Sequence, residues 1–248
     1  MNPLAYEIPV GETIPPTVAA SGRRLSLGVH RRAGDESIPG WLADVQQMRG
    51  AVLYEDGRRP SFRRVDGRFY DGDAIDLEAY HVVARSGDQA VGCVRILPLH
   101  NADATMIETR IAAREFENIL RDLGTTRAQT CEASRWMALP EFRGELGPWM
   151  VAASWTVAQS LGMAVALVLA GTRQKQDLAL VRMGARAVKG VPLFVSEVFD
   201  DELRLLYFDL PNPPAAMRRR MADEPLPLPE ESRAASGFRL ASLPAVIV

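Results

Sequence analysis

The chain has 248 residues, of which 47% are hydrophobic and 24% charged, values that disfavour disordered, collagen-like and coiled-coil classes. Its 29 lysines and arginines against 31 aspartates and glutamates give a net charge of −2, which removes the overall charge argument for binding nucleic acid or a membrane surface. The two cysteines, Cys93 and Cys131, support neither a disulfide framework nor a cysteine zinc site. Because no export signal is visible and no apolar run approaches the roughly 20 residues of a membrane span, we expect a cytoplasmic protein.

Composition divides the chain into three segments. Residues 1–36 carry prolines and glycines without sustained periodicity, which predicts an irregular N-terminal arm. Residues 37–210 contain the periodic apolar segments of a folded domain. Residues 211–248 hold seven of the 17 prolines and have little to bury, so we expect a Pro-rich C-terminal tail that wraps on the surface or is partly disordered.

In chain order, the first predicted helix covers residues 37–56, where apolar residues recur at three- and four-residue steps. The polar, arginine-rich stretch 57–76 predicts an exposed loop. Two runs of β-branched and apolar residues, 79–85 and 90–98, are separated by Ser-Gly-Asp-Gln and predict a β-hairpin. An amphipathic helix is expected over residues 111–123.

The second half of the domain continues with a predicted strand over 130–139. Pro148 suits the first position of a buried helix of about fourteen residues. The apolar run 164–171 indicates a buried strand, and Thr172 is expected to cap a helix through residue 183. A final hairpin over 192–210 completes an order that indicates one mixed α/β domain.

A candidate anion site lies where the strand ending near residue 139 leads through Arg143, Gly144 and Gly147 into a helix. Free backbone N–H groups and the helix dipole there suit a pyrophosphate or a phosphopantetheine phosphate. The same stretch is also typical of a plain strand-to-helix turn.

Five charged residues are candidates for the chemistry of the site. Glu132 lies in an apolar strand, where desolvation raises the pKa of a carboxyl group towards that of a usable base, although an internal salt bridge is an equal alternative. Asp73 and Asp76 are three residues apart and either converge on a substrate ammonium or are solvated loop charges and caps. Arg95 and Arg135 occupy interior-looking strand positions, so a carboxylate partner is expected, either the Asp pair, Glu132 or a substrate carboxylate.

The turn at residues 139–148 and the elements over 130–190 resemble the GCN5-related N-acetyltransferase (GNAT) superfamily, in which an Arg/Gln-x-x-Gly-x-Gly/Ala turn binds acyl-CoA. The chain departs from that turn, because Arg143 is followed by Gly144 and Gly147 and then by Pro148. Over residues 45–210 it resembles more specifically the acyl-homoserine-lactone synthases and the related N-acyl amino acid synthases. The residues that carry this resemblance, in order and spacing, are Arg49, Leu53, Asp73, Asp76, Tyr80, Gly92, Arg95, Pro98, Met106, Glu132, Ser134 and Arg135.

The resemblance implies a single GNAT-like α/β domain with a mixed, splayed central sheet flanked by helices. It implies transfer of a fatty acyl group from an acyl carrier protein, or from CoA, to an amine, without a metal. The pantetheine arm of the donor would enter the splayed sheet, and Trp136 is a candidate wall of the tunnel for the acyl chain, although such aromatic residues are also typical of plain core.

The lactone synthases carry an aromatic residue a few positions after the equivalent of Leu53, where this chain has Tyr54-Glu-Asp-Gly-Arg-Arg. This difference favours an amino acid-like acceptor, with Asp73 and Asp76 taking its ammonium and an arginine taking its carboxylate. The alternatives are a lactone (autoinducer) synthase that uses S-adenosylmethionine, a CoA-dependent N-acetyltransferase, and a non-enzymatic acyl-binding regulatory module.

An arginine-rich face is the predicted docking site for the acidic carrier protein; its residues are Arg58, Arg59, Arg63 and Arg64. An ordinary solvated face is the alternative. Nucleic acid is not an expected partner, because the arginines lack interleaved aromatic residues for base stacking.

Overall fold

The computed structural model describes residues 17–18, 24–32, 38–57 and 59–223. Most of the predicted N-terminal arm, Arg58 and the tail beyond residue 223 lie outside these residues. Within the described part, no helix is long and apolar enough to cross a membrane.

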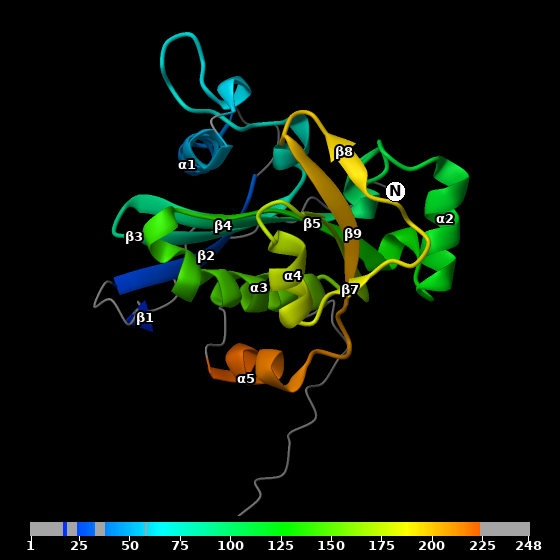
Figure 1. The fold of residues 1–248 in the computed structure, drawn as a ribbon. Coiled ribbons are helices and arrows are strands. Elements are labelled where there is room, and N and C mark those ends of the chain that lie inside the picture. Colours follow the sequence, from blue (N-terminus) through cyan, green and yellow to red (C-terminus); the bar gives the residue numbers. More distant parts are fainter. Residues whose placement is uncertain (1–16, 19–23, 33–37, 58, 224–248) are drawn as a thin grey trace, which may run out of the picture.

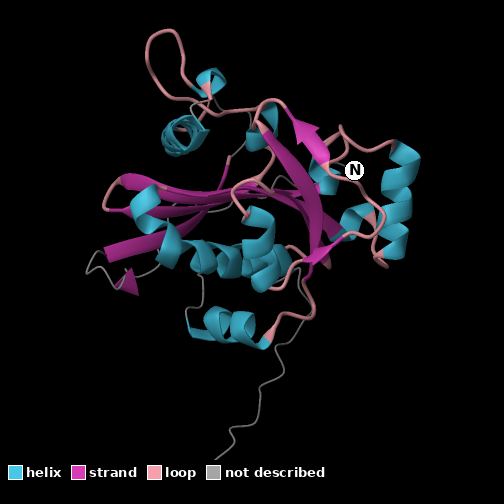
Figure 2. Cartoon of the chain, viewed as in Figure 1, coloured by secondary structure: helices cyan, strands magenta, loops and turns pink. Residues whose placement is uncertain are grey.

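The described residues form a nine-stranded sheet with five α-helices (Figures 1 and 2). The strand order is β1-β2-β3-β4-β5-β6-β9-β7, with β8 also paired to β9. The strands are β1 (Thr17–Val18), β2 (Arg24–Arg31), β3 (Tyr80–Ser86), β4 (Gln89–Pro98), β5 (Thr130–Ala138), β6 (Val165–Gly171), β7 (Arg186–Ala187), β8 (Phe194–Ser196) and β9 (Asp201–Asp209). The helices are α1 (Gly40–Gly57), α2 (Ala113–Asp122), α3 (Arg143–Ser160), α4 (Gln176–Arg182) and α5 (Ala215–Asp223).

Helices cover both faces of the sheet. Figure 1 shows α1 over one face and α3 with α4 over the other, while α5 packs on the outer side of α3. The main hydrophobic core joins α1, the sheet and α3, and includes Val45, Val94 and Trp155. A second core lies under α2, where Phe116 and Leu120 pack with Leu167 of β6. The expected mixed α/β domain is confirmed.

The sheet is splayed between β5 and β6, as expected. These two strands form a parallel pair over only three positions, from Thr130 opposite Val165 to Glu132 opposite Leu167. Beyond that point β5 remains paired with β4 and β6 remains paired with β9, so no ladder joins the carboxyl-terminal halves of β5 and β6. The separation opens a gap inside the sheet.

A β-bulge interrupts β5 beside this gap. Cys93 of β4 pairs with Met137, but Arg95 pairs with Ser134, so two residues of β5 face one residue of β4. One of the two, Arg135, has the left-handed backbone angle φ 55°, which is uncommon for a residue with a side chain. Bulges of this kind reorient side chains next to active sites.

Several local predictions are confirmed, notably the β3–β4 hairpin, α2, β5, β6 and the β8–β9 hairpin. The N-terminal arm is corrected, because Arg24–Arg31 forms β2 and pairs with β3 in the central sheet. Within the predicted tail, residues Ala215–Asp223 form α5, which packs on α3 and buries Met217. The stretch 57–76 is not simply an exposed loop, since Phe62, Asp71 and Asp76 are buried.

Two helix starts also differ from prediction. Helix α3 begins at Arg143, so Pro148 lies inside it rather than at its first position. Helix α4 begins at Gln176, after a turn in which Lys175 adopts a left-handed conformation, and Thr172 does not cap it. Gly184 follows α4 with φ 108°, in agreement with the expected helix end.

Candidate active site

A cavity of about 320 Å³ occupies the gap between β5 and β6. Its inner wall is mainly apolar and comes from the sheet, α1 and α3; representative residues are Val52, Val94, Ala133, Val151, Trp155, Val168 and Phe208. At its deep end, the Trp155 indole packs edge-on against Phe208 and donates a hydrogen bond to the Leu210 carbonyl oxygen at 2.9 Å. These contacts hold the floor of the cavity in place.

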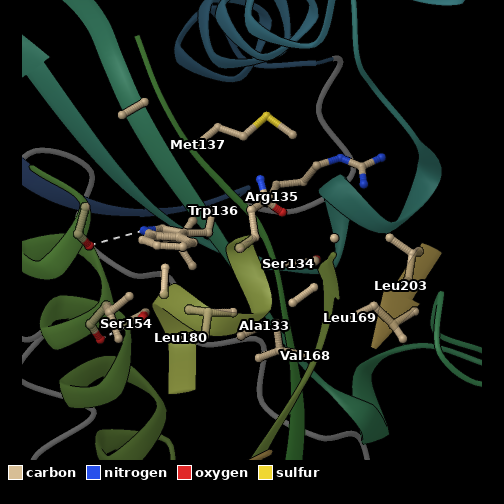
Figure 3. A pocket seen from close by; sticks show the side chains of 18 of the residues that line it. Ala133, Ser134, Arg135, Trp136, Met137, Ser154, Val168, Leu169, Leu180 and Leu203 are labelled. Atoms are coloured by element: carbon tan, nitrogen blue, oxygen red, sulfur yellow. Dashed lines mark hydrogen bonds between the residues drawn. The ribbon is translucent and has the colours of Figure 1, made fainter. Parts of the chain in front are cut away.

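The bulge interrupts the regular alternation of side chains along β5, so that Ser134 and Arg135 both face the same charged side of the strand. In Figure 3, Trp136 points towards α3, whereas Arg135 and Met137 lie on the other side. The Trp136 indole N–H donates to the Gly147 carbonyl oxygen at 3.2 Å, and both residues line the cavity. Arg135 also lines the cavity and lies 5.3 Å from the Phe199 ring centre.

On the α1 side of β5, a buried charged network joins three arginines to four carboxylates. Asp76 is fully buried and accepts from Arg49 at 2.5 and 2.9 Å, from Arg95 at 3.0 Å and from Gln46 at 2.9 Å. Arg49 also contacts the Asp71 carboxylate at 3.1 Å. Every one of these groups has at least one partner of opposite charge or polarity, which is the condition under which buried charges are tolerated.

The Asp-x-x-Asp spacing has a local explanation. Asp73 caps the short 3₁₀ turn Ala74–Leu77, its side chain accepts from the Asp76 backbone N–H, and the Asp76 side chain accepts from the Asp73 N–H. This capping box places both carboxylates beside Arg95, which donates to Asp73 at 2.6 Å. Only Asp73 of the pair reaches solvent, with 35% of its side chain exposed.

Arg135 connects this network to the cavity. Its guanidinium donates to Asp71 at 2.7 and 3.1 Å and to Asp73 at 3.3 Å. The structure therefore brings together Asp73, Asp76, Arg95 and Arg135, all predicted from the sequence as site residues.

Glu132 lies deeper than the other predicted residues. Its side chain is fully buried outside the cavity lining, and its Oε2 accepts from the Ile107 backbone N–H at 2.9 Å. Its Oε1 lies 3.9 Å from Arg95 Nη2, and neither atom has a hydrogen-bond partner among the described residues. Through its hydrogen bond with Ile107, Glu132 holds in place the loop that contains Met106, a residue of the cavity lining.

The network shifts several pKa values. Burial alone would raise the pKa of Asp76, but hydrogen bonds and charge from Arg49, with the charge of Arg95, hold it well below its usual range. Burial lowers the pKa of His81 to about 4, so this neighbour of the network is neutral at pH 7. Three arginines and four carboxylates, with a neutral histidine, leave a formal charge of −1 (3 − 4), and a net negative site favours a cationic ligand.

Neither cysteine has the character of a nucleophile. Burial raises the pKa of Cys93 and of Cys131 to about 12, so both remain thiols at neutral pH. Among the residues that the structure describes, no group of three His, Cys, Asp or Glu side chains is arranged for a metal ion.

The predicted anion-binding turn, with Arg143, Gly144 and Gly147, is part of helix α3 rather than a loop before it. Arg143 and Gly144 belong to the first turn of α3, and Arg143 is already engaged by Asp56 at 2.7 and 2.8 Å and by the Ala138 carbonyl at 3.1 Å. A Cβ on Gly147 would lie 3.2 Å from the Trp136 ring, so this glycine allows the ring to pack close to α3. Arg143 and Gly147 line the cavity, whereas Gly144 does not.

The predicted docking arginines lie apart from the buried network. Arg59 lines the cavity, while Arg63 and Arg64 are exposed and lie over the rings of Tyr54 and Tyr70. Arg58 is outside the described residues. Asp56 and Asp71 were not singled out as site residues from the sequence, because their partners Arg143 and Arg135 are 87 and 64 residues away.

Comparisons with known proteins agree with this geometry. Residues 52–153 match the family model of the acetyltransferase (GNAT) domain. No curated protein sequence gives a significant match.

Three solved structures illustrate the similarity. TofI, solved in a ternary complex with an inhibitor and MTA, is 18% identical with a TM-score of 0.54, covering 74% of this chain and 91% of TofI. BjaI, a CoA-dependent acyl-homoserine lactone synthase solved with MTA, is 18% identical with a TM-score of 0.54 over 76% of this chain and 83% of BjaI. FeeM, an N-acyl amino acid synthase from uncultured soil microbes, is 10% identical with a TM-score of 0.53 over 78% of this chain and 94% of FeeM.

These findings confirm the resemblance predicted from the sequence and support the expected N-acyltransferase activity. At such low identities the structural likeness establishes the fold. Residues 52–153 are therefore similar to the GNAT domain, and the described residues have the fold shared by acyl-homoserine lactone synthases and an N-acyl amino acid synthase.

Proposed function

We propose that this chain transfers a fatty acyl group from an acyl carrier protein thioester, and less readily from a CoA thioester, to the amine of an amino acid-like acceptor. The observation that carries this proposal is the cavity between β5 and β6, which joins an apolar interior to the charged network at the bulge. An apolar chain in the interior brings its thioester to Ser134 and Arg135, where the two sides of the site meet.

The reaction itself needs a nucleophilic amine, a proton acceptor and donors for the developing oxyanion. The amine nitrogen attacks the thioester carbonyl carbon, a C–N bond forms, the C–S bond breaks, and the sulfur leaves as a thiolate that takes up a proton. The bulge interrupts the hydrogen-bond ladder between β4 and β5 at this point. We assign stabilisation of the oxyanion to the backbone N–H groups of β5 at the bulge. Because both cysteines are protonated thiols, the amine attacks the donor directly.

For the acceptor, Asp73 is the proposed partner of the ammonium. It is the partly exposed carboxylate of a network with a net negative charge, and its Oδ2 has spare accepting capacity beside the 3.3 Å contact from Arg135. Arg135, which lines the cavity, is the proposed partner of the acceptor carboxylate. Asp76, with its oxygens engaged by Arg49, Arg95 and Gln46, orients these residues and does not contact substrate.

Glu132 remains the proposed proton acceptor. Its Oε1 has no hydrogen-bond partner among the described residues, and Glu132 lies two residues before Ser134, on the same face of β5. A fully buried carboxylate reaches the amine only through a bridging water, a route that general-base catalysis permits.

Product analysis tests the proposal. The protein is incubated with a long-chain acyl carrier protein or the matching acyl-CoA, and with either mixed amino acids or S-adenosylmethionine, before identification of products by mass. We expect a linear N-acyl amino acid and faster turnover with the carrier protein. An acyl-homoserine lactone formed only in the S-adenosylmethionine mixture would instead establish the autoinducer synthase, and a structure of BjaI with SAM and isopentyl-CoA provides the precedent for that outcome.

A further inference from the structure

Six charged side chains line the cavity, and one of them, Arg135, is paired with Asp71 and Asp73 of the buried network. We assign the other five to the mouth of the cavity; they are Asp56, Arg59, Arg143, Lys175 and Asp201. The mouth lies where β5 and β6 end, because Ala138 and Gly171 line the same cavity. A pantetheine arm that enters the gap between these strands leaves its phosphate at this mouth.

The arginine best placed for that phosphate is already paired. Arg143 stands at the start of α3, where helix N–H groups and the dipole favour an anion. Its Nη2 donates to both carboxylate oxygens of Asp56 at 2.7 and 2.8 Å, and its Nε donates to the Ala138 carbonyl at 3.1 Å. The guanidinium is therefore held by a carboxylate from α1 and by the end of β5.

We infer that Asp56 is a specificity residue that disfavours CoA as the acyl donor relative to a carrier-bound phosphopantetheine. The inference rests on the proposed acyl transfer and names the determinant of its donor. A carrier-bound arm carries one phosphodiester, whereas CoA carries a pyrophosphate and a further phosphate on its ribose. An acidic residue at the mouth therefore opposes the more highly charged donor more strongly.

The charges at the mouth fit a single phosphate. Without Arg135, which belongs to the buried network, three cations and two carboxylates give a formal charge of +1 (3 − 2). Asp201 stabilises the turn before α4, because its Oδ1 accepts hydrogen bonds from the Arg173 and Glu202 backbone N–H groups. Arg59 Nη1 makes a long hydrogen bond of 3.4 Å to the Leu53 carbonyl oxygen, whereas its Nε is buried without a hydrogen-bond partner among the described residues. This guanidinium therefore has donors left for the single phosphate. Removal of the Asp56 charge raises the formal charge of the mouth to +2 and frees the Arg143 guanidinium to donate to a phosphate.

The test is binding of free CoA, measured by titration calorimetry at low and high salt, to the wild type and to Asp56→Asn. Glu55→Gln is the matched control, because Glu55 is the exposed neighbour on the same helix and lies outside the cavity lining. Asp56→Asn should bind CoA about fivefold more tightly at low salt, with a smaller gain at high salt, whereas Glu55→Gln should change binding less than twofold. Equal gains for the two variants, or no measurable binding to either, would overturn the inference.

Two further measurements complete the test. Adding Arg143→Gln to Asp56→Asn should remove the gain, and pantetheine without phosphate should bind the wild type and Asp56→Asn equally; a gain that persists in either case contradicts the role assigned to the pair. In turnover, the ratio of kcat/KM for acyl-CoA to that for the acyl carrier protein should rise about fivefold in Asp56→Asn. Because binding needs no acceptor, loss of the binding difference refutes the role of Asp56, whereas absence of acyl transfer by the wild type with both donors refutes the proposed function.

Discussion

The two aspartates of the capping box should respond oppositely when each is replaced by asparagine. Asp76 is fully buried and contacts both Arg49 and Arg95, so Asp76→Asn leaves two buried guanidiniums without their shared charge. Breaking a buried pair costs about 3–5 kcal/mol, which in a chain of this size lowers the Tm by about 6–20 °C. Asp76→Asn should therefore appear first as a loss of stability.

Asp73 should show the reverse behaviour. Its side chain is 35% exposed, so its ion pairs with Arg95 and Arg135 are screened by solvent and contribute about 1 kcal/mol or less. Asparagine also preserves the cap of the 3₁₀ turn. Asp73→Asn should lower the Tm by less than about 4 °C, but the loss of a charged hydrogen bond to the acceptor ammonium should raise the KM for the amine at least about tenfold.

Calorimetric melting and the rate of thiol release from the acyl donor measure the two effects on the same preparations. Each variant is assayed at saturating donor and varied amine, so that a change in KM is separated from a change in kcat. Similar Tm losses in both variants, or an unchanged amine KM in a folded Asp73→Asn protein, would refute the division of roles between these residues.

Four further outcomes are expected. Glu132→Gln should lower kcat about 10²-fold with little change in the amine KM; an unchanged kcat in the folded variant excludes Glu132 as the base. Ala158→Leu, in the cavity wall, should reduce kcat/KM about tenfold for long acyl chains and less than twofold for short ones, as a donor-chain series would measure. Joint reversal of Arg63 and Arg64 to Glu should raise the KM of the carrier protein about tenfold at low salt and little at high salt, and equal effects on CoA would argue against docking there. His81 has a pKa of about 4 in the folded state and about 6.5 in the unfolded state, so the unfolded state binds more protons between these pH values. The free energy of unfolding should therefore fall by about 3 kcal/mol from pH 6.5 to pH 4. Denaturant titration should show a smaller fall for His81→Gln than for the wild type.

The elements with strong local signals were predictable from the sequence. The β3–β4 hairpin has a turn between two β-branched runs, and α2 combines a periodic apolar face with Gly124, whose φ of 67° ends the helix region. By contrast, β2 has only a short alternation of Leu25, Leu27 and Val29, and its pairing depends on β3, more than 45 residues away. Its existence is decided by tertiary contacts that no local pattern contains.

The residues of the candidate site also divide into those with a local sequence signal and those whose role depends on tertiary contacts. The spacing of Asp73 and Asp76 follows from a capping box, which is a local feature, and the sequence predicted buried partners for Arg95 and Arg135. The Asp pair was among the partners expected for them, but Asp71 was not, and neither was the pairing of Arg143 with Asp56, which lies 87 residues earlier in the chain. A sequence pattern identifies a residue type with the right chemistry, but its availability depends on which distant side chain reaches it first.

The bulge in β5 links the two halves of the proposed site. A regular strand would place residues alternately on the two faces, so Ser134 and Trp136 would share one face and Arg135 would take the other. The extra residue changes this alternation, because Ser134 and Arg135 both face the buried network, where Ser134 contacts Arg95 and Arg135 contacts Asp71 and Asp73. Trp136 is thereby moved to the opposite side, where it packs against α3 in the wall of the cavity. Because the left-handed backbone of Arg135 is unfavourable by itself, the ion pairs of its guanidinium must help to hold it. Besides the acceptor binding proposed for it, the charged network therefore stabilises the strand conformation that presents Trp136 to the cavity on the other side.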